Sequence, residues 1–400
     1  QSFSWATARK KAKAGIVITA SHNPWTDNGF KVKEETGAAA SPAILTELEA
    51  IIGPLEGRPQ DVRRMKLDDA MAKGLVERFD PAPDYLARVA ELFDLEAFRG
   101  AGYKIVCEPL FGSAAGYFPR LLGGGRTQIV ELHAERNPYF GGVNPEPIPP
   151  NIDEFLARIP AERADVGLAV DGDADRAGLA DENGRFVTTL TLYALLMWYL
   201  LEVRKLRQPV VKTVNMTSMA DRLGERYGVP VHEVPVGFKY IGPKMQETGA
   251  MMGGEESGGF GFAMHLPERD GIVADLFFLD FMHQTKKKPS QLIAELMDLA
   301  GPSFYLRRDL HLDGATYAAD KPKIMDRLQA SRPSELAGHR VARTSTLDTN
   351  DGVKYFVDDG SWLLVRLSGT EPLVRVYTET RVEKEVKPML DAGERMVRGG

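Results

Sequence analysis

Short apolar segments recur along the chain, and each of them ends in a polar loop. The runs at 14–19, 103–107, 166–170 and 210–214 are five or six residues long and largely apolar. Such runs are typical of strands buried on both faces, which occur in sheets covered by helices on each side. Sheets of this kind keep their ligands at the carboxyl ends of the strands. The pattern therefore predicts an α/β protein and directs attention to the loops that follow the runs.

Four hundred residues exceed what one hydrophobic core usually supports, so several domains are expected. Helical patterns lie at 42–52, 114–122, 190–201, 272–284 and 289–299. From about residue 305 the alternation changes, and further apolar strands follow at 362–366 and 374–377. We predict three successive mixed α/β domains and a C-terminal α+β domain, with boundaries at 1–97, 98–203, 204–302 and 303–400.

Composition and charge exclude several classes of protein. The chain is 43% hydrophobic and 26% charged with a formal net charge of −6, which argues against a nucleic-acid-binding surface. Its longest apolar stretch, 190–203, is interrupted by Thr191 and Glu202 and is too short to span a membrane. The single Cys107 excludes an internal disulfide and a cysteine-based zinc site. We predict a cytoplasmic protein without membrane or nucleic-acid partners.

The first polar loop, 19–24, carries a serine that could act as a nucleophile. Ser21 follows an apolar run, His22 is adjacent, and Lys31 lies ten residues further on. A serine becomes nucleophilic when a neighbouring group activates it and another group accepts the developing charge. Ser, His, Asn and Pro are also common in turns, and taken alone a plain turn is the more frequent case.

The second loop places three carboxylates at alternate positions between two predicted strands. Oxygens of Asp171, Asp173 and Asp175 can converge on one hard cation, for which Mg²⁺ is the first choice. Without a cation the three carboxylates would repel one another. A calcium loop of the EF-hand type is an alternative, since Glu182 occupies the twelfth position, but Arg176 stands where a glycine is needed. A solvated acidic turn is the remaining interpretation.

The third loop, 253–259, combines glycines with a carboxylate and a hydroxyl. Glu255 and Ser257 point to the same side if the segment is extended. A carboxylate and a hydroxyl suit neighbouring hydroxyls of a sugar as hydrogen-bond partners. A flexible hairpin is the alternative.

The fourth loop, 366–372, is rich in groups that bind anions. Arg366, Ser368, Gly369 and Thr370 supply a guanidinium group, two hydroxyls and exposed backbone amides, and Arg375 follows. Together these groups could form a phosphate cradle. An ordinary strand-turn-strand segment is equally compatible with this loop alone.

Together and in this order, the four loops resemble those of the α-D-phosphohexomutase family, which includes phosphoglucomutases and phosphomannomutases. The segments 236–241 and 269–272 also resemble family segments that flank the sugar loop. The likeness extends over nearly the whole chain, and it is specific because four independent loops follow the family order. It implies four domains around a central cleft, with one loop from each.

The resemblance also implies roles for individual residues. Ser21 would be the phosphoserine and a further ligand of the Mg²⁺ held by Asp171, Asp173 and Asp175. His22, Lys31 and Arg176 would lie near the transferring phosphoryl group, with Lys31 as a candidate acid or base. The substrate would be bound by Lys239, Glu255, Ser257, Arg269, Arg366, Ser368, Gly369, Thr370 and Arg375.

The implied activity is the interconversion of hexose 1-phosphate and hexose 6-phosphate by a monomer or homodimer. Phosphoserine gives its phosphate to the sugar, the bisphosphate turns around, and the serine takes back the other phosphate; glucose 1,6-bisphosphate would be intermediate and activator. Glu256 favours glucose, because mannose-type loops often carry Met there and glucosamine-type loops Gln. Dual-specificity members often carry His where this chain has Phe238 and Lys239.

Alternatives to a glucose-specific mutase stay open at this point. The nearest are a phosphomannomutase and a mutase of dual specificity. A metal-dependent sugar phosphatase and a sugar-phosphate-binding protein without catalysis belong to other classes. The chain begins with Gln1, and twenty residues precede Ser21. Since the family has roughly 70–80 residues there, we expect the first domain to be incomplete at its N-terminus.

Overall fold

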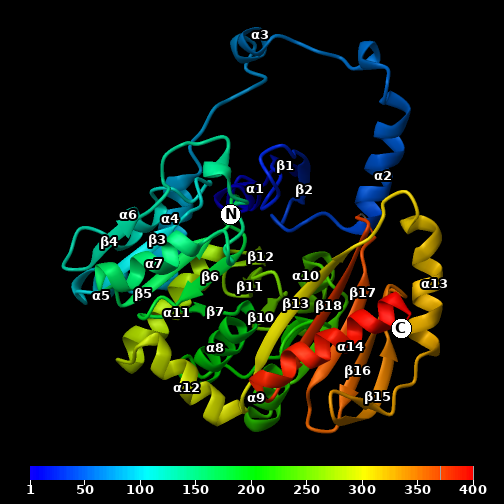
Figure 1. Cartoon of the computed structure of the whole chain (residues 1–400). Helices are drawn as coiled ribbons and strands as arrows, with labels where there is room; N and C mark the ends of the chain where they lie inside the picture. The colour runs from blue at the N-terminus through cyan, green and yellow to red at the C-terminus, as the bar shows by residue number, and fades with distance from the viewer. Residues whose placement is uncertain (370, 400) are drawn as a thin grey trace.

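The structure is a computed structural model that describes residues 1–369 and 371–399. Two mixed five-stranded sheets and one six-stranded sheet form most of the molecule, and a two-stranded ribbon lies near the N-terminus. Figure 1 shows the sheet around β3 and β5 on the left, the sheet around β10 and β11 in the middle, and the C-terminal sheet on the right. The predicted α/β fold with a distinct C-terminal part is confirmed.

The N-terminal part consists of short helices and the antiparallel β1–β2 ribbon. Its elements are α1 Ser2–Arg9, β1 Ala14–Ile18, β2 Phe30–Glu34, α2 Pro42–Ile52, η1 Gly53–Leu55, η2 Pro59–Asp61, α3 Leu67–Ala72, α4 Ala82–Leu92 and α5 Leu95–Gly100. The strand predicted at 14–19 is present, but the prediction that it is fully buried is wrong. Ile16 and Ile18 are 61% and 69% exposed. The strand pairs with β2 alone, and only the face at Gly15 packs against α1.

The first mixed sheet has the order β4-β3-β5-β6-β7, with parallel pairing among its first three strands. Its part of the chain contains β3 Lys104–Glu108, α6 Tyr117–Leu122, β4 Gln128–Glu131, η3 Phe140–Gly142, α7 Asp153–Glu162, β5 Val166–Val170, β6 Ala177–Ala180, β7 Phe186–Val187 and α8 Thr189–Glu202. The strand predicted at 166–170 coincides with β5, and all five of its residues are buried. The aspartate loop therefore starts at the carboxyl end of a central strand.

The second mixed sheet has the order β12-β11-β10-β8-β9. Its part of the chain contains β8 Val210–Thr213, α9 Met219–Tyr227, β9 Val231–Val234, α10 Phe238–Thr248, β10 Met252–Gly254, β11 Phe260–Phe262, β12 Leu266–Arg269, α11 Gly271–Thr285 and α12 Pro289–Ala300. Helices α8 and α11 pack on each other and share one hydrophobic core with residues of both mixed sheets. The loops after β5 and β10 are thereby held in a fixed relation, because a close-packed core resists deformation.

The C-terminal sheet is antiparallel throughout, in the order β13-β18-β17-β16-β15-β14. This part contains β13 Phe304–His311, α13 Tyr317–Ala330, β14 Glu335–Leu336, β15 His339–Thr346, β16 Gly352–Val357, β17 Trp362–Leu367, β18 Leu373–Thr380, η4 Glu383–Glu385 and α14 Val386–Arg398. The predicted domain boundaries stay a prediction. Within residues 1–369 and 371–399, no helix combines the length and apolar character that crossing a membrane requires.

A buried carboxylate joins the C-terminal sheet to the second mixed sheet. Glu379 in β18 accepts hydrogen bonds from Thr217, Ser218, Ser303 and the indole of Trp362. Burial alone would raise the pKa of Glu379, but these donors more than offset that effect and lower the pKa. The contact orders the two sheets relative to each other, since leaving this charge unpaired in the interior would be costly.

A second buried charge at the same interface predicts a pH-dependent stability. The Lys354 ammonium donates to Val214 O at 2.5 Å and lies 3.3 Å from Glu233. Burial lowers the pKa of Lys354 from 10.5 to about 8, and Glu233 offsets only part of that shift. The unfolded chain therefore binds more protons between these two pH values, so this group's contribution to the free energy of unfolding rises with pH there.

The comparison that checks this is the melting temperature of the wild type against Lys354→Met at pH 7, 8, 9 and 10. The methionine variant lacks the titrating group. Above pH 8 the free energy of unfolding of the wild type should therefore rise relative to that of the variant, by at most about 3 kcal/mol. A difference between the two proteins that stays constant with pH would contradict the assignment.

Candidate functional site

Loops from distant parts of the chain meet around a cavity of about 760 Å³. The residues that line it come from the serine loop, the aspartate loop, the sugar loop and the C-terminal sheet. Those predicted from the sequence are His22, Arg176, Glu255, Ser257, Arg366 and Arg375. A cavity of this size is large enough for a small organic ligand.

Ser21 lies beyond the end of β1 in a left-handed backbone conformation, with φ of 56°. Few residues other than glycine adopt this conformation, and it is often found at functional sites. The Ser21 amide donates to Thr19 Oγ1 at 2.8 Å, which fixes the turn. Its hydroxyl lies 3.2 Å from Asp171 Oδ2 and 3.1 Å from Asp173 Oδ1. The serine and aspartate loops, 150 residues apart in sequence, are therefore in direct contact.

Gly172 allows this close approach. A Cβ at this position would lie 2.7 Å from the carbonyl oxygen of Ser21 and 3.2 Å from Pro145. Any larger residue would push the two loops apart, so the glycine sets the distance between the serine and the aspartates.

The three aspartates form a compact group of oxygens. One oxygen from each of Asp171, Asp173 and Asp175 lies within 4.8 Å of the others. Burial raises the pKa of Asp171, and the two neighbouring carboxylates raise it further. Among the described residues, Asp175 Oδ1 is buried and has no hydrogen-bond partner. An all-carboxylate group with a buried oxygen that accepts no hydrogen bond fits a hard divalent cation such as Mg²⁺.

Lys31 and Arg176, both predicted to lie near the phosphoryl group, are beside the aspartates. Lys31 Nζ donates to Asp173 at 2.7 Å and to Asp175 at 3.2 Å. Burial alone would lower the pKa of Lys31, but these two carboxylates more than offset it and raise the pKa. Arg176 Nη1 donates to Glu146 at 3.2 Å. Lys31 is thus protonated in this arrangement and can serve as a proton donor.

His22 has a different electrostatic character. Burial, reinforced by the Arg176 guanidinium, lowers the pKa of His22 to about 3. Its imidazole is therefore neutral near pH 7. A neutral ring can donate or accept a hydrogen bond, but with so low a pKa it is a weak base.

Arg269 links the aspartate loop to the sugar loop. Its guanidinium lies 2.7 Å from Asp175 Oδ2 and 2.9 Å from Glu255 Oε1. The adjacent Glu268 pairs with the buried Lys33 at 2.5 Å. Arg269 Nε also donates to Glu268 at 3.3 Å, so this residue, predicted to bind substrate, is bonded to three carboxylates of the protein itself.

The sugar loop forms a tight turn, so the condition that the segment be extended, under which Glu255 and Ser257 would point to the same side, is not met. Gly258 N donates to Glu255 O at 3.0 Å, and Glu255 N donates to Gly259 O at 3.1 Å. Both predicted side chains nevertheless line the cavity. Ser257 Oγ is buried and makes no hydrogen bond to any described residue. Lys239 is exposed at the start of α10 and is not part of the cavity lining.

The C-terminal loop brings two arginines to the cavity. Arg366 Nε donates to Asp351 at 2.8 Å, and Arg375 Nη2 donates to Glu371 at 3.1 Å. The buried Ser368 accepts a hydrogen bond from the Glu371 amide at 3.1 Å. Gly369 is exposed, and neither it nor Ser368 lines the cavity. Thr370 lies outside the described residues.

Several cavity residues were missed by the sequence interpretation. Arg307, Asp309 and His311 line the cavity from alternate positions of β13, and a strand's period of two places such residues on one face. This alternation of polar residues is visible in the sequence and could have indicated that one face of the strand lines a site. Glu146 also lines the cavity, from the segment between η3 and α7.

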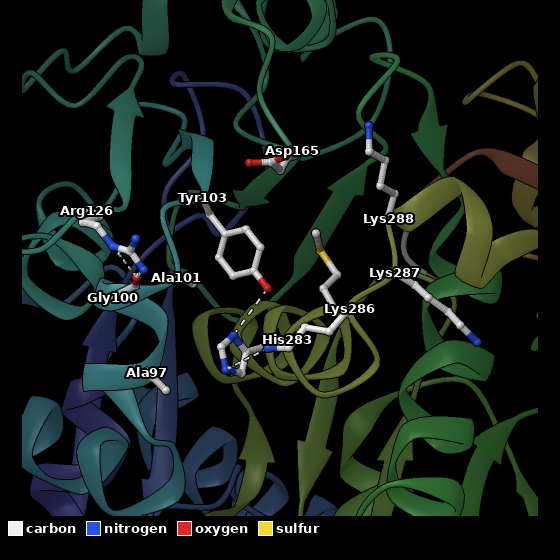
Figure 2. A pocket seen from close by; sticks show the side chains of 11 residues that line it. Ala97, Gly100, Ala101, Tyr103, Arg126, Asp165, His283, Lys286, Lys287 and Lys288 are labelled. Carbon is white, nitrogen blue, oxygen red and sulfur yellow. Dashed lines mark hydrogen bonds between the residues drawn. The ribbon is translucent and has the colours of Figure 1, made fainter.

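A second cavity, of about 700 Å³, lies at the opposite edge of the first mixed sheet, near the beginnings of β3, β4 and β5. Figure 2 shows Tyr103 and His283 pointing toward each other there, joined by a hydrogen bond of 3.4 Å. None of the predicted site residues that the structure describes lines it. The candidate site is therefore the cavity at Ser21.

Comparison with known proteins identifies the family. Phosphoglucomutase/phosphomannomutase sequence profiles match in chain order: α/β/α domain I at 1–56, domain II at 83–184, domain III at 191–300 and the C-terminal domain at 318–392. A phosphoglucomutase/phosphomannomutase of Thermococcus kodakarensis is 31% identical over 98% of this chain and 80% of its own length. This chain belongs to the phosphoglucomutase/phosphomannomutase family. The resemblance inferred from the four loops is confirmed.

Other relatives differ in the sugar that their names give. A probable phosphoglucosamine mutase of Methanothermobacter thermautotrophicus is 30% identical over 96% of this chain and 78% of its own length. The structure of a putative phosphomannomutase from Thermus thermophilus matches with a TM-score of 0.82 and 32% identity, covering 99% of this chain and 81% of that one. The chain is thus a phosphohexomutase, an intramolecular phosphotransferase, and membership of the phosphoglucomutase/phosphomannomutase family leaves the sugar open.

Proposed function

We propose that the protein interconverts glucose 1-phosphate and glucose 6-phosphate through phosphorylated Ser21 and a glucose 1,6-bisphosphate intermediate. The observation that carries this proposal is the contact of Ser21 Oγ with Asp171 and Asp173, at 3.2 and 3.1 Å, beside a cavity that the sugar loop also lines. A simple phosphatase would need the first two of these loops but not the third.

The chain's own groups suit each half of the reaction. In the first half the bond between Ser21 Oγ and phosphorus breaks while a sugar hydroxyl bonds to phosphorus in line. Lys31, whose ammonium pairs with Asp173 and Asp175, donates a proton to the departing Ser21 oxygen, while the attacking sugar hydroxyl releases its own proton to water. In the second half Lys31 takes the proton of Ser21 as its oxygen attacks the turned bisphosphate, and the departing sugar oxygen takes a proton from water. Arg176 lies close enough to the aspartates to neutralise phosphoryl oxygens, with Nε 3.8 Å from Asp171.

Asp171, Asp173 and Asp175 are the residues that would hold a metal ion. Mg²⁺ bound there would supply positive charge to the phosphoryl oxygens. An Aspergillus fumigatus N-acetylphosphoglucosamine mutase, which shares the fold with a TM-score of 0.59 and 17% identity, was solved in complex with GlcNAc-6P and magnesium. That complex supports the choice of metal.

The remaining loops suit the parts of the substrate that do not react. The buried Ser257 hydroxyl is available to a sugar hydroxyl, and Glu255 lies beside it. Arg366 and Arg375 pair with Asp351 and Glu371, and a phosphate dianion can compete for such guanidinium groups through paired hydrogen bonds. Both halves of the reaction would use these same contacts, since the sugar binds in two orientations.

Glucose is proposed as the preferred sugar from the likeness of the sugar loop to the glucose-preferring loops. A phosphoglucomutase of Komagataeibacter xylinus, 27% identical over 92% of this chain and 69% of its own length, is compatible with it. A mannose or mixed preference is the second candidate, since the Thermus thermophilus neighbour at 32% identity is described as a putative phosphomannomutase.

The test is turnover of glucose 1-phosphate with Mg²⁺ and a trace of glucose 1,6-bisphosphate. We expect glucose 6-phosphate as product, with kcat/KM about 10-fold above that for mannose 1-phosphate, because the two sugars differ only in the orientation of one hydroxyl. Protein shown to carry a phosphate on Ser21 and still forming no product would contradict the proposal. Release of inorganic phosphate that does not depend on the bisphosphate would favour a phosphatase instead.

A further inference from the structure

Glu256 lies between the two predicted sugar ligands, but its side chain contacts the C-terminal sheet. Its carboxylate accepts a hydrogen bond from the hydroxyl of Tyr305 at 2.6 Å and lies 3.6 Å from Arg307 Nη1. Tyr305 and Arg307 are alternate residues of β13, so their side chains share one face of the strand. The Glu256 side chain is only 13% exposed, which shields this contact from solvent.

The contact continues to the phosphate-binding loop through charged side chains. Arg307 Nε lies 3.1 Å from Asp309, and Asp309 lies 3.9 Å from Arg375 Nε. On the other side, the backbone of Glu256 is fixed by Thr189, whose hydroxyl donates to Glu256 O at 2.5 Å. A chain of polar contacts therefore runs from α8, through the sugar loop, to Arg375.

Two further contacts between the same two parts of the chain involve residues that do not line the cavity. Glu379 and Lys354 join the C-terminal sheet to residues of the second mixed sheet, and neither lines the cavity. They hold the C-terminal sheet to the second mixed sheet through residues outside the cavity lining, whereas Glu256 joins the two parts inside the cavity itself.

We propose that Glu256 is a positioning residue: it ties the sugar loop to the C-terminal sheet through Tyr305 and Arg307 and so sets the distance between the sugar-binding and phosphate-binding groups. This inference rests on the proposed mutase function. It assigns Glu256 an indirect effect on the substrate, because its carboxylate is bonded to the protein and not directed at the sugar.

A consequence concerns the bisphosphate, which must turn around between the two half-reactions without leaving the protein. The distance that Glu256 sets decides whether the sugar and the distal phosphate can be held at once. Without the contact, binding of both substrate and bisphosphate weakens, while the groups that carry out phosphoryl transfer at Ser21 are unchanged.

The kinetic test uses Glu256→Ala in the full chain. We expect the KM for glucose 1-phosphate and the concentration of glucose 1,6-bisphosphate for half-maximal activity each to rise about 10-fold, with a smaller change in kcat. Glu256→Gln, which can still accept from Tyr305, should restore most of the loss. Tyr305→Phe should produce part of the same effect, and the double variant should fall short of the sum, since both changes remove one contact.

The structural test is amide hydrogen exchange, which does not depend on catalysis. Exchange in 304–311 should be faster in Glu256→Ala than in the wild type, because β13 loses its tie to the sugar loop. Glu385→Gln is the matched control: Glu385 contacts His339 at 3.1 Å within the C-terminal part, so both exchange and KM should stay as in the wild type.

The alternative that would overturn the proposal is direct recognition of the sugar by Glu256. In that case Glu256→Met would change the ratio of kcat/KM for glucose and mannose about 10-fold and leave exchange in 304–311 unaltered. Under our proposal, Glu256→Met changes kcat/KM for the two sugars by the same factor, within about two-fold, and amide exchange in 304–311 becomes faster. If the wild type lacks mutase activity, the proposed function fails, while the exchange measurement still decides whether the contact holds the two parts together.

Discussion

Replacing Ser21 with alanine is expected to lower kcat for glucose 1-phosphate at least about 1000-fold. Alanine has no oxygen to carry the phosphoryl group, and a direct transfer between the two ends of a hexose is geometrically excluded. The fold should survive the change, because Ser21 is only partly buried and its backbone is held by Thr19 and by the close contact with Gly172.

Intact mass and a coupled assay together check this result. After incubation with glucose 1,6-bisphosphate, the wild type should gain the mass of one phosphoryl group and Ser21→Ala should gain none. Ser41→Ala is a suitable control, since Ser41 precedes α2 and its side chain makes no capping hydrogen bond. Mutase activity that persists in Ser21→Ala would show that the phosphoryl group travels by another route.

Much of the fold could be predicted because strands buried on both faces appear in the sequence as short, continuous apolar runs. The runs at 166–170 and 210–214 appear as β5 and β8, and the helical pattern at 42–52 coincides with α2. Three of the four loops stand where a predicted apolar strand ends, at 14–19, 166–170 and 362–366, whereas the sugar loop was found from its glycines, carboxylate and hydroxyl. Their order then carried the family resemblance, which the comparisons confirm.

Other features depend on partners that local patterns do not specify. The run at 14–19 is as apolar as 166–170, yet β1 has a single neighbouring strand and exposes Ile16 and Ile18. Arg269 could be assigned to the site, but its bonds to Asp175 and Glu255 come from the packing of two sheets. The contact of Glu256 with Tyr305 likewise joins residues 49 positions apart.

The second large effect is expected at the aspartate loop, where Asp173→Asn should reduce kcat about 100- to 1000-fold at low Mg²⁺. Asparagine has nearly the same shape, so the change removes charge and leaves the packing intact. Asp173 contacts Ser21 Oγ at 3.1 Å and Lys31 Nζ at 2.7 Å. Losing its charge weakens cation binding and also leaves Lys31 with Asp175 as its remaining carboxylate partner among the described residues.

Binding of Mn²⁺, followed by its paramagnetic signal, separates these two effects from a loss of fold. We expect affinity for Mn²⁺ to fall in Asp173→Asn and to stay unchanged in Glu182→Gln, because Glu182 bonds to Ser290 at the start of α12. Lost binding in Glu182→Gln would instead favour a calcium loop of the EF-hand type, in which the twelfth residue is a ligand. Asp173→Asn with wild-type activity at low Mg²⁺ would mean that the loop is a solvated acidic turn. Asp173→Asn and Glu182→Gln each remove one carboxylate, and the two positions are nine residues apart on one segment. A metal site formed by Asp171, Asp173 and Asp175 predicts that only the first variant loses affinity for Mn²⁺, whereas an EF-hand loop predicts that both lose it.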